Sequence, residues 1–329
     1  MIYERICALL VAAILPIAAQ PLYGFTDRMV AEGVKAEDYQ ASIWRTDIKD
    51  HNACLPSAFR TCFSALSAEN AKDGMNKEYI PSGRGLSGTK MSGSGQFDEA
   101  QMDNIASEIR QYHDGDICIV DIRQESHLLI NGESFSRYAE RDWGNLGKDR
   151  NAVTIMEAEL VETVTGESIE AYTLDENKNP EKPVTITAES VRTEKEAAEA
   201  HGFEYYRLPC TDHVCPTPEV IDDFISFVKT LDDDTWLHFH CEGGKGRTTF
   251  FMALYDILQN PDVSLKDIAY RQCEIGGNYI LTASDESWKS PYYAEKAQNI
   301  ELIYQYAQEN HDTGYTLSYS EWLSQTGGK

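Results

Sequence analysis

A ten-residue stretch, 240–249, combines the residue types that transfer a phosphoryl group to sulfur. It reads HCEGGKGRTT, and Cys241 stands six positions before Arg247. The apolar segments on either side predict a strand before the turn and a helix after it. Backbone N–H groups of a glycine-rich turn, together with a helix N-terminus, bind anions. The same field favours a thiolate at Cys241, and the planar guanidinium of Arg247 can bind two phosphate oxygens.

Each residue in this stretch also has a simpler explanation. The glycines can serve only the turn conformation, and a cysteine at a strand end is often a small buried hydrophobe. His238, His240 and Cys241 suggest a metal, but no further cysteine or histidine follows at ligand spacing. Because strand, cysteine, spaced glycines, arginine and helix coincide, we interpret the stretch as a phosphate-binding loop without a metal.

A cysteine nucleophile needs a proton donor for the leaving oxygen. Asp212 is the best candidate, because it lies in the loop after the preceding predicted strand. Loops at the carboxyl ends of parallel strands converge on the ligand in α/β sheets. Asp212 could instead only cap a turn. His213 beside it could bind substrate or merely satisfy a hydrogen bond within the loop.

The charge of the chain limits its partners. The 54 acidic and 29 basic residues give a formal charge of −25. The length of 329 residues allows one large domain or two smaller ones. No basic stripe is present, which argues against nucleic acid as a partner. Since salt screens charges over about 10 Å, we expect an electropositive pocket on an otherwise acidic surface.

The N-terminus predicts export. Arg5 precedes an uncharged run, 6–19, that ends at a plausible signal cleavage point near Ala18 and Ala19. The alternative is a buried N-terminal helix. Removal of residues 1–19 leaves seven cysteines, an odd number that fits one reactive thiol plus possible pairs such as Cys54 with Cys62. We therefore expect a periplasmic or secreted protein without a membrane-spanning segment in its mature form.

Periodicity predicts an α/β fold. Segments 20–60 show weak periodicity and are interpreted as irregular. Strands alternating with helices imply a mainly parallel sheet flanked by helices. The expected helices cover about 97–112, 193–200, 218–231, 264–273 and 294–309, and the expected core strands about 117–122, 203–208 and 236–239.

A different pattern occupies the middle of the chain. Segments 152–161 and 184–188 are rich in β-branched residues, which suggests antiparallel hairpins. We therefore expect a small antiparallel β domain at 128–190, inserted between a first core part, 20–127, and a second core part, 191–329.

These motifs, with others along the chain, resemble the protein-tyrosine-phosphatase-like inositol polyphosphate phosphatases, the bacterial cysteine phytases. The resemblance extends through segments 121–127 (DIRQESH), 140–148 (ERDWGNLGK) and 270–277 (YRQCEIGG), as well as 211–219 (TDHVCPTPE). It implies a phosphatase core with a small β domain, and hydrolysis of phosphate from phytate and lower inositol phosphates without a cofactor or metal.

The resemblance also implies roles for individual residues. Cys241 would be the nucleophile, Arg247 the phosphate-binding arginine, Asp212 the general acid and Thr248 the hydroxyl that helps the thiolate leave. The substrate-binding residues would be Glu242, Gly243, Gly244, Lys245 and Gly246 in the loop, with Arg60, Asp142, His213, Lys289 and Lys296 around the inositol ring. One departure is Ser190, where the family has a lysine; Arg192 is a possible substitute.

The reaction needs a deprotonated cysteine and a protonated aspartate, so we expect a bell-shaped pH profile with an acidic optimum. Three other functions remain open. A protein-tyrosine or dual-specificity phosphatase and a phosphoinositide lipid phosphatase share this chemistry, although no basic amphipathic helix is evident for membrane binding. A secreted inositol-phosphate-binding protein could keep the loop without turnover. Oligomers are possible.

Overall fold

The computed structural model describes residues 23–48, 50–281 and 287–327. The expected signal peptide, 1–19, lies outside these ranges. Within them, no helix has both the length and the apolar character needed to cross a membrane.

A five-stranded sheet forms the core of the molecule. Its strands run in the order β10 (Glu204–Cys210), β4 (Ile117–Arg123), β11 (Trp236–His240), β3 (Met91–Ser94) and β2 (Arg60–Thr61). The first four are parallel to one another, and only β2 is antiparallel to its neighbour. Strand β4 is buried along its whole length because helices cover both faces of the sheet.

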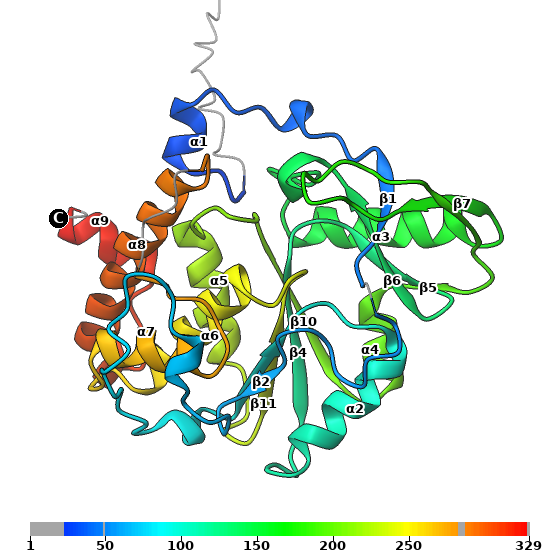
Figure 1. Ribbon diagram of the computed structural model, residues 1–329. Coiled ribbons are helices and arrows are strands. Elements are labelled where there is room, and N and C mark those ends of the chain that lie inside the picture. Colours follow the sequence, from blue (N-terminus) through cyan, green and yellow to red (C-terminus); the bar gives the residue numbers. More distant parts are fainter. Residues whose placement is uncertain (1–22, 49, 282–286, 328–329) are drawn as a thin grey trace, which may run out of the picture.

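The helices form two groups (Figure 1). On one side lie α5 (Pro218–Val228), α6 (Gly246–Gln259), α7 (Leu265–Glu274), α8 (Ser290–Asn310) and α9 (Tyr319–Thr326), and on the other side α2 (Glu99–Ile109) and α4 (Glu194–Ala200). Helix α6 is buried along nearly its entire length, since it packs between the sheet and helices α7 and α8. This packing fixes the N-terminus of α6 at the end of β11.

A second, six-stranded sheet lies beside the core (Figure 1). Its order is β8 (Val184–Thr187), β7 (Ser168–Tyr172), β1 (Ile43–Thr46), β6 (Glu133–Tyr138), β5 (His127–Ile130) and β9 (Val191–Arg192). All neighbouring pairs are antiparallel except β1 with β7. A separate apolar cluster that includes Trp44 and Phe135 fills its inner face. The predicted fold class, a mainly parallel sheet flanked by helices with an antiparallel β unit, is confirmed.

Two local predictions were wrong. Segment 152–161, expected to be strand, belongs to α3 (Arg150–Val164), whose buried residues Val153, Glu157 and Val164 recur at helical spacing. Asp149 caps this helix by accepting a hydrogen bond from the backbone N–H of Ala152. The capping and the spacing of the buried face outweigh the strand preference of the β-branched residues.

The segment expected to be irregular, 20–60, also contains regular structure. It includes α1 (Asp27–Ala31) and β1, and the latter lies in the middle of the second sheet between β7 and β6. Four residues are too few for a periodic pattern to stand out. The partner strands, which decide the structure here, lie far away in sequence.

Candidate active site

The stretch 241–245 forms a tight loop between β11 and α6. Its left-handed residue Gly244 (φ +68°) must be glycine, because a Cβ there would lie 2.3 Å from the backbone nitrogen of Gly95. The carbonyl of Glu242 accepts a hydrogen bond of 2.9 Å from the backbone N–H of Gln96. Strand, loop and helix therefore have the predicted order, and contacts with segment 94–96 hold the loop in place.

The Cys241 thiol lies at the base of this loop. It is 3 % exposed, and the hydroxyl of Thr248 donates a hydrogen bond to its sulfur over 3.1 Å. Thr248 is in the first turn of α6 and fully buried. A hydroxyl donor at this distance stabilises a sulfur anion.

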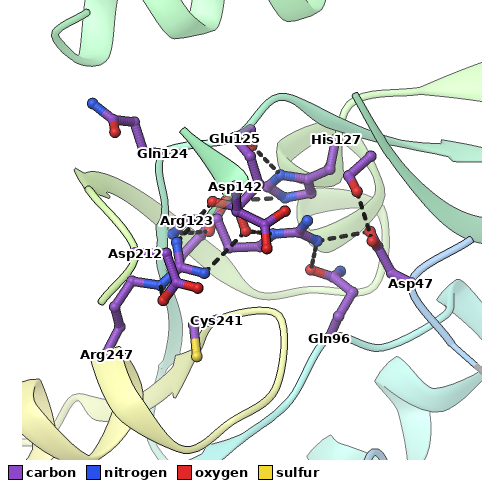
Figure 2. Close-up of polar contacts among 12 residues, drawn as sticks. Asp47, Gln96, Arg123, Gln124, Glu125, His127, Asp142, Asp212, Cys241 and Arg247 are labelled. Atoms are coloured by element: carbon purple, nitrogen blue, oxygen red, sulfur yellow. Dashed lines mark hydrogen bonds and ion pairs between the residues drawn. The ribbon is translucent and has the colours of Figure 1, made fainter. Parts of the chain in front are cut away.

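Arg247 is held by two carboxylates (Figure 2). Its two terminal nitrogens lie 2.7 and 3.0 Å from the two carboxylate oxygens of Glu125, and its Nε lies 3.1 Å from Oδ1 of Asp212. The bidentate pair fixes the plane of the guanidinium. Burial alone would raise the pKa of Glu125, but Arg247 outweighs it and lowers that pKa well below the ordinary value.

Asp212 begins the loop that follows β10. Its backbone carbonyl accepts a hydrogen bond of 3.0 Å from the indole N–H of Trp143, and Val214 two residues later is fully buried. Trp143 and Val214 belong to a small apolar cluster with Met29 of α1 and Tyr292 of α8. Three other segments, those of Trp143, α1 and α8, therefore hold the loop that carries Asp212.

The charge of Asp212 depends on its neighbour. Burial alone would raise the pKa of Asp212, but the Arg247 guanidinium outweighs it and lowers the pKa below the ordinary value. The side chain of His213 lies near by, with its Nε2 3.1 Å from Oδ2 of Asp212 and its Nδ1 3.1 Å from the hydroxyl of Tyr293. Burial lowers the pKa of His213 to about 4, although Asp212 opposes the shift. His213 is therefore a neutral imidazole at mildly acidic pH.

Asp142 approaches the site from the second sheet. It has a left-handed backbone (φ 61°), and its carboxylate lies 2.7 Å from a guanidinium nitrogen of Arg45 on β1. Burial raises the pKa of Asp142 to about 7; Arg45 opposes this shift, and the nearby Glu125, Asp212 and Glu242 reinforce it. Several carboxylates thus surround the predicted anion site.

The predicted lysines differ in their surroundings. Lys296 is nearly buried on α8, where burial lowers its pKa and Asp212 opposes the shift. Lys245 donates a hydrogen bond of 2.6 Å to the carbonyl of Gly276, and Lys289 lies at the start of α8 beside Trp288. A cavity of about 150 Å³ opens beside the loop, lined by residues that include Gly246, Lys296, Lys72, Asn278 and Tyr293.

Two predicted positions have other partners. Arg60, expected at the inositol ring, is 2 % exposed and lies against the loop, donating to the carbonyl of Gly244 over 2.8 Å. Arg192, considered in place of the family lysine at Ser190, forms an ion pair with Glu99 of α2. Direct contact of Arg60 and Arg192 with a ring stays a prediction.

Sequence reasoning missed Glu125 and Arg45. Glu125 lies within the motif 121–127, two residues after the fully buried strand β4. A charged residue just after a buried strand was a signal that could have identified it. Arg45 gave no such signal, since its strand was not recognised. All seven cysteines in the described ranges are free thiols. Cys54 and Cys62, considered as a possible pair, therefore form no disulfide in the structure.

One cluster outside the loop has metal-ligand chemistry. Asp121, Glu194 and His240 are buried, and one ligand atom from each lies within 4.8 Å of the others. Asp121 is already paired with Arg207, and Nε2 of His240 lies 2.8 Å from Oε1 of Glu194. These contacts make the cluster a buried polar network.

Comparisons with known proteins agree with this geometry. A family model for PTP-like phytases matches residues 120–259; the description of this family reads "Inositol hexakisphosphate". The PTP-like myo-inositol phosphatase of Mitsuokella multacida, solved in complex with myo-inositol-(1,3,4,5)-tetrakisphosphate, is 42 % identical, with a TM-score of 0.83 over 87 % of this chain and 50 % of that one. A PTP-like phytase from Bdellovibrio bacteriovorus is 30 % identical, with a TM-score of 0.67 over 87 % of this chain and 96 % of that one.

A curated relative is the effector protein hopD2 of Pseudomonas syringae, 26 % identical over 248 residues, which are 72 % of this chain and 52 % of the effector. The chain thus spans about half the length of the effector and of the Mitsuokella protein. Its similarity to the Bdellovibrio enzyme extends over nearly the whole of both chains. The chain therefore belongs to the family of protein-tyrosine-phosphatase-like phytases.

Proposed function

We propose that this protein hydrolyses phosphate monoesters of inositol polyphosphates, phytate among them, through a cysteinyl-phosphate intermediate. The observation that carries the proposal is the meeting of Cys241, Arg247 and Asp212 at the carboxyl ends of β10 and β11, with Arg247 oriented by Glu125. Nucleophile, anion clamp and proton donor lie on three different elements.

In the first step the Cys241 thiolate attacks phosphorus, forming an S–P bond as the P–O bond to the inositol breaks. Asp212 gives its proton to the departing oxygen. Arg247 and the loop N–H groups stabilise the charge on the remaining phosphoryl oxygens. In the second step water attacks phosphorus and loses a proton to Asp212. The S–P bond breaks, and the hydroxyl of Thr248 stabilises the returning thiolate.

Substrate binding raises the pKa of Asp212 and so favours its protonated form. In the free protein Arg247 lowers the pKa of Asp212 and favours its ionised form. A phosphate that binds Arg247 neutralises this guanidinium and adds negative charge beside Asp212, and both effects raise the pKa of Asp212. The acid is therefore protonated most readily when a polyanion occupies the site. This supports an acidic optimum.

Cations around the site support a multiply charged substrate. Lys245, Lys289 and Lys296 have no carboxylate within 4.0 Å among the described residues, although the chain is strongly acidic. The solved Mitsuokella relative holds an inositol tetrakisphosphate. The loop, Arg247 and these lysines supply the positive field, so the proposed reaction needs no metal, and chelators should leave turnover unchanged.

The test is phosphate release from phytate across pH for wild type, C241S and D212N. We expect an optimum below neutrality, no turnover in C241S, and a large loss in D212N. An optimum above neutrality, or undiminished turnover in D212N, would remove Asp212 as the acid. Faster turnover of a phosphotyrosine peptide would favour the protein phosphatase alternative. Phytate binding without release, equal in wild type and C241S, would favour the binding protein.

We also propose that residues 1–19 direct export. Expression of the full chain in a Gram-negative host should give a periplasmic or extracellular protein that lacks this segment. An unprocessed cytoplasmic product would contradict the proposal.

A further inference from the structure

Arg60 differs from the other buried arginines of the protein. In the described ranges the other buried arginines number five, and each lies within 4.0 Å of a carboxylate oxygen, as Arg271 does with Asp256. Arg60 is 2 % exposed, yet in the described part of the chain it has no carboxylate at that distance. The paired arginines are Arg45, Arg123, Arg207, Arg247 and Arg271.

The hydrogen bonds of Arg60 are all to neutral groups. One terminal nitrogen donates to the carbonyls of Gly244 and Ala58 over 2.8 and 3.0 Å, and the other to the hydroxyl of Thr249 over 3.1 Å. Its Nε has no hydrogen-bond partner among the residues that the structure describes. Gly244 belongs to the catalytic loop and Thr249 to the first turn of α6. The guanidinium is thus fastened to the element that carries the nucleophile.

A buried charge without a counter-charge is costly. The chain does not lack acids, since 54 are available against 29 bases. Burial lowers the pKa of Arg60 to about 10, and the Cys241 thiolate is the foremost group opposing that shift. Its hydrogen bonds to Gly244 and Thr249 place this uncompensated charge against the loop that carries Cys241.

We propose that Arg60 is a positioning residue whose buried charge stabilises the Cys241 thiolate from behind the loop. This deepens the proposed function and rests on it. Arg247 on α6 and Cys210 on β10 interact electrostatically with the thiol. Cys273 on α7, Lys245 and His238 on β11 interact in the same way with Arg60.

The test separates the charge of Arg60 from its hydrogen bonds. R60Q removes the charge, R60K retains it, and T249V removes one acceptor while Arg60 stays intact. The measurement is the rate of Cys241 alkylation by iodoacetamide against pH in the free protein. Peptide mass spectrometry distinguishes Cys241 from the exposed Cys54. No turnover is involved, so the result does not depend on the identity of the substrate.

We expect R60Q to raise the midpoint of alkylation by about one pH unit, an about tenfold slower reaction below the midpoint. R60K and T249V should keep the wild-type midpoint. A folded R60Q with the wild-type midpoint would overturn the proposal. If R60Q does not fold, R60K and T249V still test the proposal. A raised midpoint of alkylation in either variant would show that hydrogen bonding, and not the charge of Arg60, stabilises the thiolate. An unchanged phytase activity in R60Q with a raised midpoint would instead contradict the thiolate mechanism.

Discussion

At the scale of single residues, the orientation of Arg247 is the feature that most clearly distinguishes an active site from a structural loop. Glu125 binds both terminal nitrogens, which leaves Nε toward Asp212 and fixes the plane in which phosphate can bind. Glu125 does not reach the reacting atoms itself. It is a positioning residue that acts through Arg247.

E125Q tests this role while preserving the shape of the side chain. Loss of one charge-assisted bidentate contact, worth about 1.5–3 kcal/mol, should lower kcat/KM for phytate by about 10–100-fold. Steady-state kinetics of E125Q and of E162Q, an exposed glutamate on α3, give the comparison. Equal values for E125Q and wild type would show that Arg247 is oriented without Glu125.

The raised pKa of Asp142 predicts how the free energy of unfolding changes with pH. Burial raises its pKa from 3.8 to about 7, so the folded protein keeps a proton that the unfolded chain loses. Between these pH values the folded state binds more protons, and its free energy of unfolding falls as pH rises. D142N removes this contribution. Urea unfolding from pH 4 to 7 should therefore show a smaller decline in D142N than in wild type or in the exposed control D114N; equal declines would contradict the raised pKa.

At the scale of elements, the loop carrying Asp212 is fixed by its neighbours. Trp143 binds the carbonyl of Asp212, and Val214 enters the same apolar cluster as α1 and α8. Asp212, the proposed proton donor, therefore lies beside Arg247 before any substrate binds.

W143F keeps most of the ring but removes the indole N–H. The loss of one buried hydrogen bond should cost about 1 kcal/mol of stability. It should also lower kcat by about 3–10-fold with little change in KM, because the acid is misplaced while binding groups stay in place. The control is W44F, the same change in the second sheet. If the two variants have the same kcat, the hydrogen bond does not position Asp212.

The elements also show what sequence alone could reveal. The loop at 241–247 and the strands before it were predictable, because continuous apolar strands and spaced glycines are local signals. Helix α3 was not, since its β-branched residues favour strand and its buried face is set by packing against β5 and β10. Arg45 was missed for the related reason that β1 exists only through its partners, β6 and β7.

At the scale of the whole molecule, positive charge is concentrated near the site although the chain as a whole is acidic. The chain carries a formal −25, yet three buried arginines, Arg45, Arg123 and Arg247, are linked through Asp47 and Glu125 between the second sheet and the core. A fourth, Arg60, lies against the catalytic loop. The core sheet positions the proposed nucleophile and acid, and the second sheet contributes Asp142 with Arg45. Both sheets thus contribute residues to the proposed anion site.

The central claim is that phosphorus passes through the sulfur of Cys241. The most direct measurement is mass spectrometry of the peptide containing Cys241 after phytate turnover is stopped within milliseconds by denaturant. Wild type should carry one phosphoryl group on Cys241, and C241S should carry none and release no phosphate. Phosphate release by C241S, or rapid turnover of wild type with no phosphoryl group ever found on Cys241, would contradict the account.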